Sequence, residues 1–529
     1  MTATIDTLLL LLAVLVAVAI AARRFRIAPP ILLVVAGLLL AAMPGVPAIE
    51  LAPELVLFGI LPPLVYEAGV AMSWREFRFN LRSIVQLAFG YVVFTAAAVA
   101  AAAHWLLGLP PAIAFMLGAI VAPTDPVAPV SIMRDMGVPR RLLVILQGEG
   151  LANDATALIL YRFAVAAVAT GLFSPLAAAG TFVLIVAGEI AFGIGVGWLS
   201  LRLRRWARDP RVEISLSLLT PYAAFLIPAH VGGSGVLAAM TAGLFASWNG
   251  PLLIPAATRL QGIFFWDLVV YLLEGTVFLV TGLQMRALLD RSDSAHWLGP
   301  VVIAVLLTVA VIVATRFVWI YPVAHLARWL DPSLARRDPV PPWQWLFLLA
   351  FVGVRGVVSL AAALAVPLTT AAGAPFPYRD FVIYVAFGVI VVTLVGQGLL
   401  LPGMVSRLGL TREADDEHTR ERDAEHLARS GALKVALQRL EEAARDREIE
   451  PEVLAILRAR HDYRAAGFPE RLHSPGAAER AAELRTELIA AERQYIYGLL
   501  RDGEITDGAR RRIERDLDLE EAGIADLPI

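Results

Sequence analysis

Long apolar runs constrain the fold of this chain more than any other feature. They fill residues 5 to about 406, and each spans roughly 17–28 residues, the length that crosses the ~30 Å hydrocarbon core of a bilayer as a helix. Because lipid offers no hydrogen-bond partners, the backbone of each run must pair within its own segment, as a helix does. Strands of a membrane barrel would be shorter and would alternate in hydropathy. The sequence therefore predicts an all-α polytopic membrane protein.

We predict thirteen transmembrane helices. The first run lacks a basic flank and a small-residue cleavage site, so we expect a retained helix and not a removed signal peptide. The second is short and lies between prolines. The predicted spans cover residues 5–22, 29–43, 51–72, 80–106, 110–134, 140–170, 175–204, 212–228, 232–248, 258–285, 297–327, 343–368 and 379–406.

The arginines between the spans predict the orientation of the chain. With the N-terminus outside, the connections on the cytoplasmic side hold eighteen arginines and those on the opposite side hold three, which agrees with the positive-inside rule. An odd number of spans then places the C-terminus in the cytoplasm. The eighteen are Arg23, Arg24, Arg26, Arg75, Arg78, Arg82, Arg134, Arg140, Arg141, Arg202, Arg204, Arg205, Arg208, Arg211, Arg259, Arg328, Arg336 and Arg337; the three are Arg286, Arg291 and Arg379.

The composition changes after residue 408. Residues 412–447 are dense in Arg, Asp and Glu with apolar residues at helical spacing, and a second helical stretch covers about 476–502. We expect a transmembrane domain over 1–408 and a soluble, helical cytoplasmic tail over 409–529. A dimerising or stabilising appendage and a regulatory domain both stay open for the tail.

Charged side chains inside the spans mark candidate functional positions, because charge in the bilayer core is costly. Asp125 lies among Pro123, Pro126 and Pro129, and three prolines in seven residues interrupt a helix. A break at mid-membrane is tolerated where it lines a cavity or is buried in protein. We expect Asp125 to cap a half-helix and Thr124 to offer oxygen atoms to an ion.

Glu149 and Asp154 lie five residues apart in one span, and Asn153 directly precedes the second of them. A carboxylate in a low-dielectric cavity holds a proton readily, and its oxygens also suit a hard cation such as Na+. Proton and cation would then compete for one site, and such competition is sufficient for exchange.

Arg355 lies between Gly353 and Gly356, and a buried guanidinium needs an acidic partner. We expect that partner to be Glu149, in a structural ion pair. The glycines allow another backbone to approach closely, which fits a second broken helix in the second half of the chain. Arg316 is expected to compensate helix ends or another carboxylate.

Glu67 follows a proline pair near the end of a span, so an interfacial position and a cavity-lining position both stay open. The remaining charged positions are expected to serve packing. Glu189, Asp267 and Glu274 are expected to be local hydrogen-bond anchors, and Arg162 to snorkel or to pair within the bundle.

Taken jointly and in order, these motifs resemble the sodium/proton exchangers of the monovalent cation:proton antiporter-1 family, in its bacterial branch. The resemblance covers residues 5–406. It implies two inverted repeats with broken helices crossing at mid-membrane, and a core domain that moves against a dimerisation domain. It further implies a homodimer in the bacterial inner membrane, with no cofactor and no nucleic-acid partner. The motifs are Leu61-Pro62-Pro63 with Glu67, Thr124-Asp125-Pro126, Glu149 with Asn153-Asp154, and Gly353 with Arg355-Gly356.

The resemblance also assigns roles to residues. It implies that Asp154 binds the ion and the proton, and that Na+ is held at Asp154, Thr124 and Asp125. Glu67 matches an acidic residue that contacts the ion, directly or through water, in some relatives. Asn153 stands where another branch has a second Asp, which suggests electroneutral exchange of one cation for one proton.

One position departs from the family pattern. Gly150 stands where some relatives have a serine that donates its hydroxyl to the cation. A water or a backbone oxygen must replace that ligand, so potassium and lithium stay open as alternatives to sodium.

Three other functions fit the sequence less well. A cation channel would need a continuous pore lined by polar rings, whereas charge here gathers at paired breaks in two halves. An intramembrane serine protease is suggested only by Gly232-Gly233-Ser234-Gly235, and glycines around a serine are common in helix packing. An ATP-driven pump is disfavoured because the chain has no glycine-rich loop followed by lysine; its one lysine is Lys434.

Overall fold

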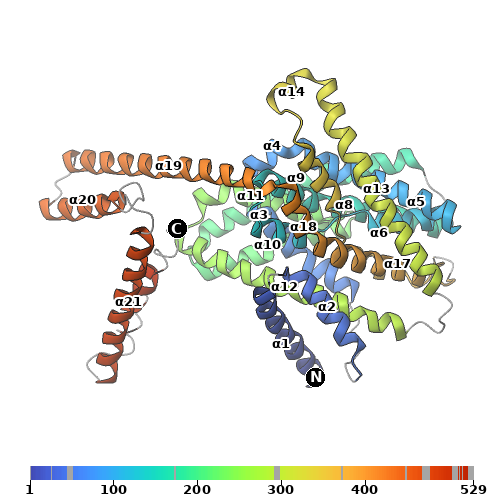
Figure 1. The fold of residues 1–529 in the computed structure, drawn as a ribbon, viewed down its shortest axis with the longest axis horizontal. Helices are drawn as coiled ribbons and strands as arrows, with labels where there is room; N and C mark the ends of the chain where they lie inside the picture. The colour runs from blue at the N-terminus through green and yellow to red at the C-terminus, as the bar shows by residue number, and fades with distance from the viewer. Residues whose placement is uncertain are drawn as a thin grey trace. The chain divides into compact units, whose positions relative to one another are not determined.

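The computed structural model describes residues 2–25, 27–44, 52–171, 174–290, 298–370, 373–446, 450–466 and 477–502, with 510, 513–514 and 516–521 near the C-terminus. Helices joined by short connections make up most of this structure (Figure 1). Arg26 and Arg291, which entered the count of loop charges, lie outside the described residues, as do the first residues of the predicted spans 51–72 and 297–327.

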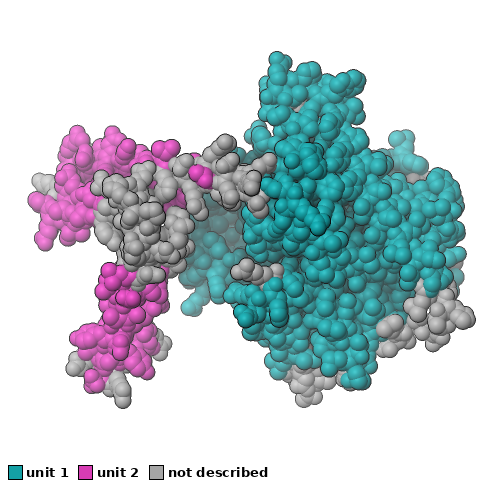
Figure 2. Space-filling view, in the orientation of Figure 1, with its two compact units in different colours: residues 1–415 teal, residues 416–529 magenta. Residues whose placement is uncertain are grey.

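The chain divides into two compact units, Met1–Asp415 and Asp416–Ile529, which Figure 2 draws in teal and magenta. The helices up to residue 408 are α1 (Thr2–Phe25), α2 (Pro29–Ala42), η1 (Leu55–Ile60), α3 (Leu61–Ala71), α4 (Trp74–Val85), η2 (Gln86–Tyr91), α5 (Val92–Leu107), α6 (Pro111–Val121), α7 (Val127–Asp135), α8 (Arg140–Thr170), α9 (Pro175–Ala207), α10 (Pro210–His230), α11 (Val236–Leu253), α12 (Ala256–Asp290), α13 (Leu298–Leu330), α14 (Pro332–Arg337), α15 (Trp343–Phe351), α16 (Val357–Leu364), α17 (Arg379–Val391), η4 (Val392–Gln397) and α18 (Gly398–Leu408).

Each predicted span overlaps one helix or a run of consecutive helices. Within the described residues, seven helical stretches are long and apolar enough to cross a membrane, and three shorter helices are also apolar. The prediction of an all-helical polytopic membrane protein is therefore confirmed. The short span at 29–43 is helix α2, whose first turn carries both prolines at positions where the missing N–H costs nothing.

Glycines bring pairs of helices into close contact. Gly37 of α2 faces Gly282 of α12, and a β-carbon on Gly37 would lie 2.9 Å from the Cα atom of Gly282. Gly69 of α3 faces Gly243 of α11 in the same way. Such small residues let helix backbones approach closely in lipid, where van der Waals contact replaces the hydrophobic effect as the driving force for association.

Among the described residues, three predicted spans contain a π-helical segment: η1, η2 and η4. A π-helical turn inserts a residue into the helical repeat and so rotates the side chains that follow it. Tyr91 closes η2 and Thr393 lies in η4, and both side chains are fully buried. They contact the arginines of the site described below.

Beyond residue 408 the structure is again helical, with α19 (Leu410–Asp446), α20 (Pro451–Ala466) and α21 (Ala477–Arg501). The two predicted helical stretches overlap α19 and α21, and α20 was not predicted. In unit 2, Ile489 of α21 packs against Leu517, and Arg493 pairs with Asp518 and Glu521, each at 2.6 Å. These contacts tie the end of the described chain to α21.

Candidate functional site

Two helical runs of unit 1 are interrupted, and the interruptions meet. The chain leaves the helical conformation over 122–126, between α6 and α7, and over 352–356, between α15 and α16. The amide of Asp125 donates a hydrogen bond to the carbonyl of Val354 at 2.8 Å, which joins the two extended stretches directly. Prolines cause the first break, and glycines accompany the second.

Asp125 lies at the N-terminal ends of two half-helices. Its Oδ1 accepts a hydrogen bond from the amide of Val127 at 2.9 Å, which is the cap expected for α7. A β-carbon on Gly356 would overlap the Asp125 carboxylate, so the absence of a side chain there lets the carboxylate lie against the start of α16. Both helix N-termini present partial positive charge to this carboxylate.

Two arginines occupy the C-terminal ends of the opposite half-helices. Arg355 donates to the carbonyls of Val121 at 2.8 Å and Ala122 at 3.4 Å, at the end of α6. Arg316 donates to the carbonyl of Leu349 at 2.7 Å, near the end of α15. The last carbonyls of a helix lack partners within it and carry partial negative charge. Arg316 therefore lies at a helix end, where compensation was expected, and Arg355 lies at the end of α6 in the same way.

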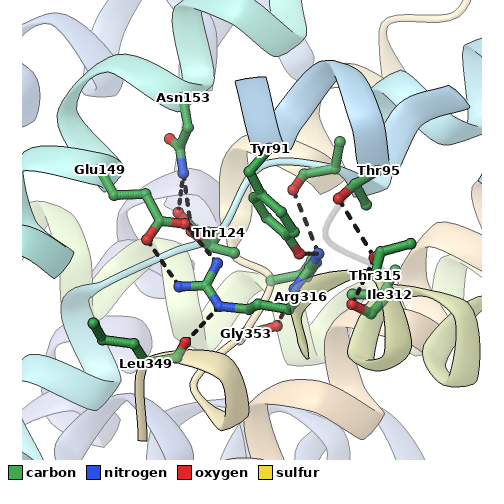
Figure 3. Close-up of polar contacts among 12 residues, drawn as sticks. Tyr91, Thr95, Thr124, Glu149, Asn153, Ile312, Thr315, Arg316, Leu349 and Gly353 are labelled. Carbon is green, nitrogen blue, oxygen red and sulfur yellow. Dashed lines mark hydrogen bonds and ion pairs between the residues drawn. The ribbon is translucent and has the colours of Figure 1, made fainter. Parts of the chain in front are cut away.

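The structure corrects the predicted ion pair between Glu149 and Arg355. Glu149 pairs with Arg316 through two parallel contacts, Nη1 to Oε1 at 2.6 Å and Nη2 to Oε2 at 2.8 Å (Figure 3). The Arg355 guanidinium is instead occupied by backbone carbonyls, including that of Gly353, and by the hydroxyl of Tyr91 at 3.2 Å. Glu149, Arg316 and Arg355 are all buried. The bidentate pair with Arg316 compensates the buried charge of Glu149.

Thr124 and Asn153 connect the ion pair to the first break. The Thr124 hydroxyl donates to Glu149 Oε1 at 2.7 Å, and Asn153 Nδ2 donates to the carbonyl and hydroxyl oxygens of Thr124 at 2.8 and 3.0 Å (Figure 3). The remaining amide oxygen, Asn153 Oδ1, is buried without a hydrogen-bond partner in the described structure. Both side chains hold the break in place, and the unpaired oxygen is suited to receive a cation or a donor.

Asp154 differs from every other charged residue at the crossing. Its side chain is half-buried, and within the described part of the chain it forms no hydrogen bond and no ion pair. The nearby carboxylate of Asp125 repels a negative charge on Asp154. A carboxylate in this position is stabilised by whatever neutralises it, whether a proton or a cation.

Further acidic side chains lie within electrostatic range of the crossing. Glu274 of α12 interacts with the charges of Asp125 and Glu67, and Glu67 of α3 interacts with that of Asp267. Asp267 and Glu274 were expected to be local hydrogen-bond anchors, but neither forms a hydrogen bond in the described structure, so that expectation is wrong. The position of Glu274 along α12 could not show that it lies within electrostatic range of Asp125 and Glu67.

The same expectation is confirmed for Glu189. Its carboxylate accepts hydrogen bonds from the backbone amides of Ser234, Gly235 and Leu237 at 2.5, 2.9 and 3.2 Å, at the start of α11. The Ser234 hydroxyl donates to the same carboxylate at 2.9 Å. The Gly-x-Ser-Gly stretch is therefore a helix start capped by a buried acid, and its serine has the hydrogen bond of a structural residue and not of a nucleophile.

Tyr91 and Thr393 are components of the site that the sequence did not indicate. The Tyr91 ring lies under the Arg316 guanidinium, 5.0 Å from its carbon to the ring centroid, while the Tyr91 hydroxyl accepts from Arg355. The Thr393 hydroxyl accepts from the backbone amide of Arg355 at 3.1 Å. Polar side chains within otherwise apolar runs were the available signal for both.

Gly150, the departure from the family pattern, packs against the first break. A β-carbon at this position would overlap the ring of Pro126. A serine could therefore enter only if the break moved, because a proline ring in a buried turn has little freedom to shift. The close packing of Pro126 against Gly150 therefore leaves no room for a side chain that could carry a hydroxyl.

Three comparisons bear on this arrangement. Residues 10–407 match the family described as "Sodium/hydrogen exchanger, transmembrane". An uncharacterized Na+/H+ exchanger of Mycobacterium tuberculosis is 34% identical, covering 98% of this chain and 95% of its own length, and a sodium, potassium, lithium and rubidium/H+ antiporter of Bacillus pumilus is 30% identical, covering 90% and 71%. The solved structure of the sodium proton antiporter MjNhaP1 from Methanocaldococcus jannaschii has the same fold, with a TM-score of 0.61, 18% identity, and coverage of 77% of this chain and 99% of that one.

Proposed function

This chain belongs to the sodium/hydrogen exchanger family of antiporters, and we propose that it exchanges one Na+ for one H+ at Asp154. The observation that supports the proposal is that the Asp154 side chain has no polar partner in the described structure. Asp154 is a half-buried carboxylate beside two crossed helix breaks, without a hydrogen bond or ion pair in the described structure. Each ligand neutralises it, and the two exclude one another because they need the same oxygens.

The exchange cycle follows from the cost of a buried charge. Open to one side, Asp154 releases its proton and binds the cation together with Asp125, Thr124 and water, with Glu67 contributing directly or through water. The loaded site is neutral and can move across the membrane barrier, whereas the empty carboxylate cannot, because desolvating it costs several kcal/mol. Water and neutral oxygens complete the cation shell.

A ratio of one cation to one proton is supported by the charges around Asp154. The charge of Glu149 is compensated by its ion pair with Arg316. Asn153, the neighbour of Asp154, carries no charge and is tied to Thr124. Asp125 is held in place by the amide of Val127 and by its packing against Gly356. One carboxylate, Asp154, then changes its ligand in each half-cycle.

The architecture that serves this cycle is thirteen membrane spans in two inverted repeats, in a homodimer. The pairs α6/α7 and α15/α16 would be the broken spans of the two repeats, and the positive-inside rule places the N-terminus outside and the tail over 409–529 in the cytoplasm. The tail serves dimerisation or regulation. The bacterial inner membrane is the expected location.

More than one monovalent cation is compatible with this site. The relative from Bacillus pumilus carries sodium, potassium, lithium and rubidium in its name. Gly150 offers no hydroxyl that would tune the site to one ion size. We therefore propose Na+ as the principal substrate, with K+ and Li+ as alternatives.

Competition between cation and proton tests the proposed function. In proteoliposomes with a permeant anion such as thiocyanate collapsing the membrane potential, we expect the apparent KM for Na+ to rise as pH falls, by up to about tenfold per pH unit, at an unchanged maximal rate. Lower pH protonates the carboxylate and removes the cation's ligand. A pH effect confined to the maximal rate would rule out a shared site, and Na+ flux without proton counterflow would indicate a channel.

The packing of Asp125 against Gly356 gives a second prediction. Gly356→Ala places a methyl group where the Asp125 carboxylate lies, and overpacking of this kind costs about 1–3 kcal/mol. We expect cation-driven proton efflux to fall about tenfold or more while folded protein is still obtained. Gly195→Ala is the matched control, because a β-carbon there meets no atom within 4 Å. Native exchange by the Gly356→Ala protein would show that the crossing tolerates displacement of Asp125.

A further inference from the structure

A cavity of about 540 Å³ lies away from the crossing, at the end of α9 and the start of α10. Its volume is in the range of small-molecule sites. The proposed orientation puts this end of the helices at the cytoplasmic surface, and the inference below depends on that orientation and not on the exchange chemistry. The lining residues are Arg202, Arg204, Arg205, Trp206, Arg208, Glu213, Leu253 and Pro255.

Positive charge dominates this cavity. Four arginines face one carboxylate, and within the described structure none of the four forms an ion pair. Loops that join membrane helices on the cytoplasmic side are commonly basic, but their arginines are normally solvated. Here they line one partly open cavity, which concentrates positive potential where a ligand would lie.

Arg204 distinguishes the cavity from a basic surface. Its side chain is only 7% exposed, it donates one hydrogen bond to the Tyr66 hydroxyl at 3.0 Å, and its Nε is buried without a partner in the described structure. A buried guanidinium with an unused donor is destabilised unless an acceptor enters. Glu213 lines the same cavity with an unpaired Oε2, so the one acid present does not satisfy Arg204.

The other lining arginines are placed to complete an anion site. Arg202, Arg205 and Arg208 are exposed, and Arg202 stacks over the Trp206 ring at 5.6 Å. Arg208 adopts a left-handed backbone conformation, with φ of 51°, where the chain turns from α9 into α10. Guanidinium groups bind phosphate oxygens through paired N–H donors, which makes several convergent arginines selective for phosphate over halide.

We propose that this cavity binds a phosphate-bearing anion at the cytoplasmic surface. A phosphodiester or phosphomonoester would meet the unpaired donor of Arg204 at the base and the exposed arginines at the rim. Basic pockets between membrane helices on this side are suited to anionic lipid headgroups. Exposed Trp206 and Leu253 border the cavity and provide an apolar path for acyl chains. A soluble phosphate compound shares the recognition chemistry and is separated from a lipid by experiment.

The test measures binding and not transport, so it is independent of exchange activity. The full chain in detergent is titrated with phosphatidylglycerol, with cardiolipin, with phosphatidylcholine and, separately, with inorganic pyrophosphate. Binding is followed by native mass spectrometry and by the thermal midpoint. We expect the anionic lipids to bind and to raise the midpoint by a few degrees, and phosphatidylcholine to do neither.

Variants connect binding to this cavity. Arg205→Gln combined with Arg208→Gln removes two exposed charges, so folding should be retained, and we expect affinity to fall about tenfold or more. Arg211→Gln is the matched control, an exposed arginine of the same connection that does not line the cavity. Pyrophosphate binding without lipid binding, lost in the double variant, would support the site with a soluble ligand. Equal anion binding by the double variant and the native protein, or no binding of any anion, would overturn the proposal.

Discussion

Asp154→Asn is expected to abolish cation-driven proton exchange, leaving the signal of protein-free liposomes. An amide neither releases a proton at accessible pH nor offers the charge that compensates a desolvated cation. Folding should be unaffected, because Asp154 forms no hydrogen bond or ion pair in the described structure that the substitution would remove. The measurement is proton efflux from acid-loaded proteoliposomes after addition of Na+, K+ or Li+.

Asp135→Asn is the control for this substitution. Asp135 is an exposed carboxylate at the end of α7, so the same chemical change there should leave efflux at the native level. The cation that drives efflux in the native protein establishes the selectivity. Efflux that persists in the Asp154→Asn protein would assign the site to another carboxylate, and Asp125 and Glu274 would be the next candidates.

Arg316→Ala is expected to have the largest effect on stability, about 3–5 kcal/mol. The substitution leaves the buried charge of Glu149 without its partner and the carbonyl of Leu349 without its donor. It also removes the cation that lies over the Tyr91 ring. We expect little folded protein, or a strongly lowered thermal midpoint, measured by size-exclusion chromatography and melting of the detergent-solubilised protein.

Two comparisons decide whether the ion pair is the cause. Glu149→Gln combined with Arg316→Met removes both charges, and it should be more stable than Arg316→Ala because no unpaired charge remains. Arg141→Ala removes the partially exposed pair with Asp338, which should cost no more than about 1 kcal/mol. A native midpoint for Arg316→Ala would show that Glu149 is compensated by another group.

The sequence predicted much of the fold because the bilayer leaves few choices. Apolar runs of spanning length must be helical, so the segments were readable without knowledge of their neighbours. The breaks were also readable, since Pro123, Pro126 and the glycines around Arg355 act on the local backbone. Asp154 was indicated by the cost of placing a second carboxylate in one span.

Tertiary structure alone decided which charges meet. Glu149 and Arg316 lie 167 positions apart. The residues around each of them in the sequence do not show that the two side chains meet. Arg355 lies in a family motif, yet its guanidinium turns to the end of α6 because the extended stretch at 352–356 directs it there. The acidic neighbours of the site likewise depend on how α12 is rotated, which periodicity does not specify in a helix that has apolar residues on all its sides.

The chain by itself therefore determined the helical segments, the two breaks and the carboxylate at the crossing, because each follows from local backbone chemistry or from the cost of charge in lipid. The pairing of Glu149 with Arg316, the contacts of Tyr91 and Thr393 and the approach of Glu274 required the folded structure. They arise from helices that are distant in sequence and from π-helical turns that rotate buried side chains, and a residue pattern read along one dimension does not encode either.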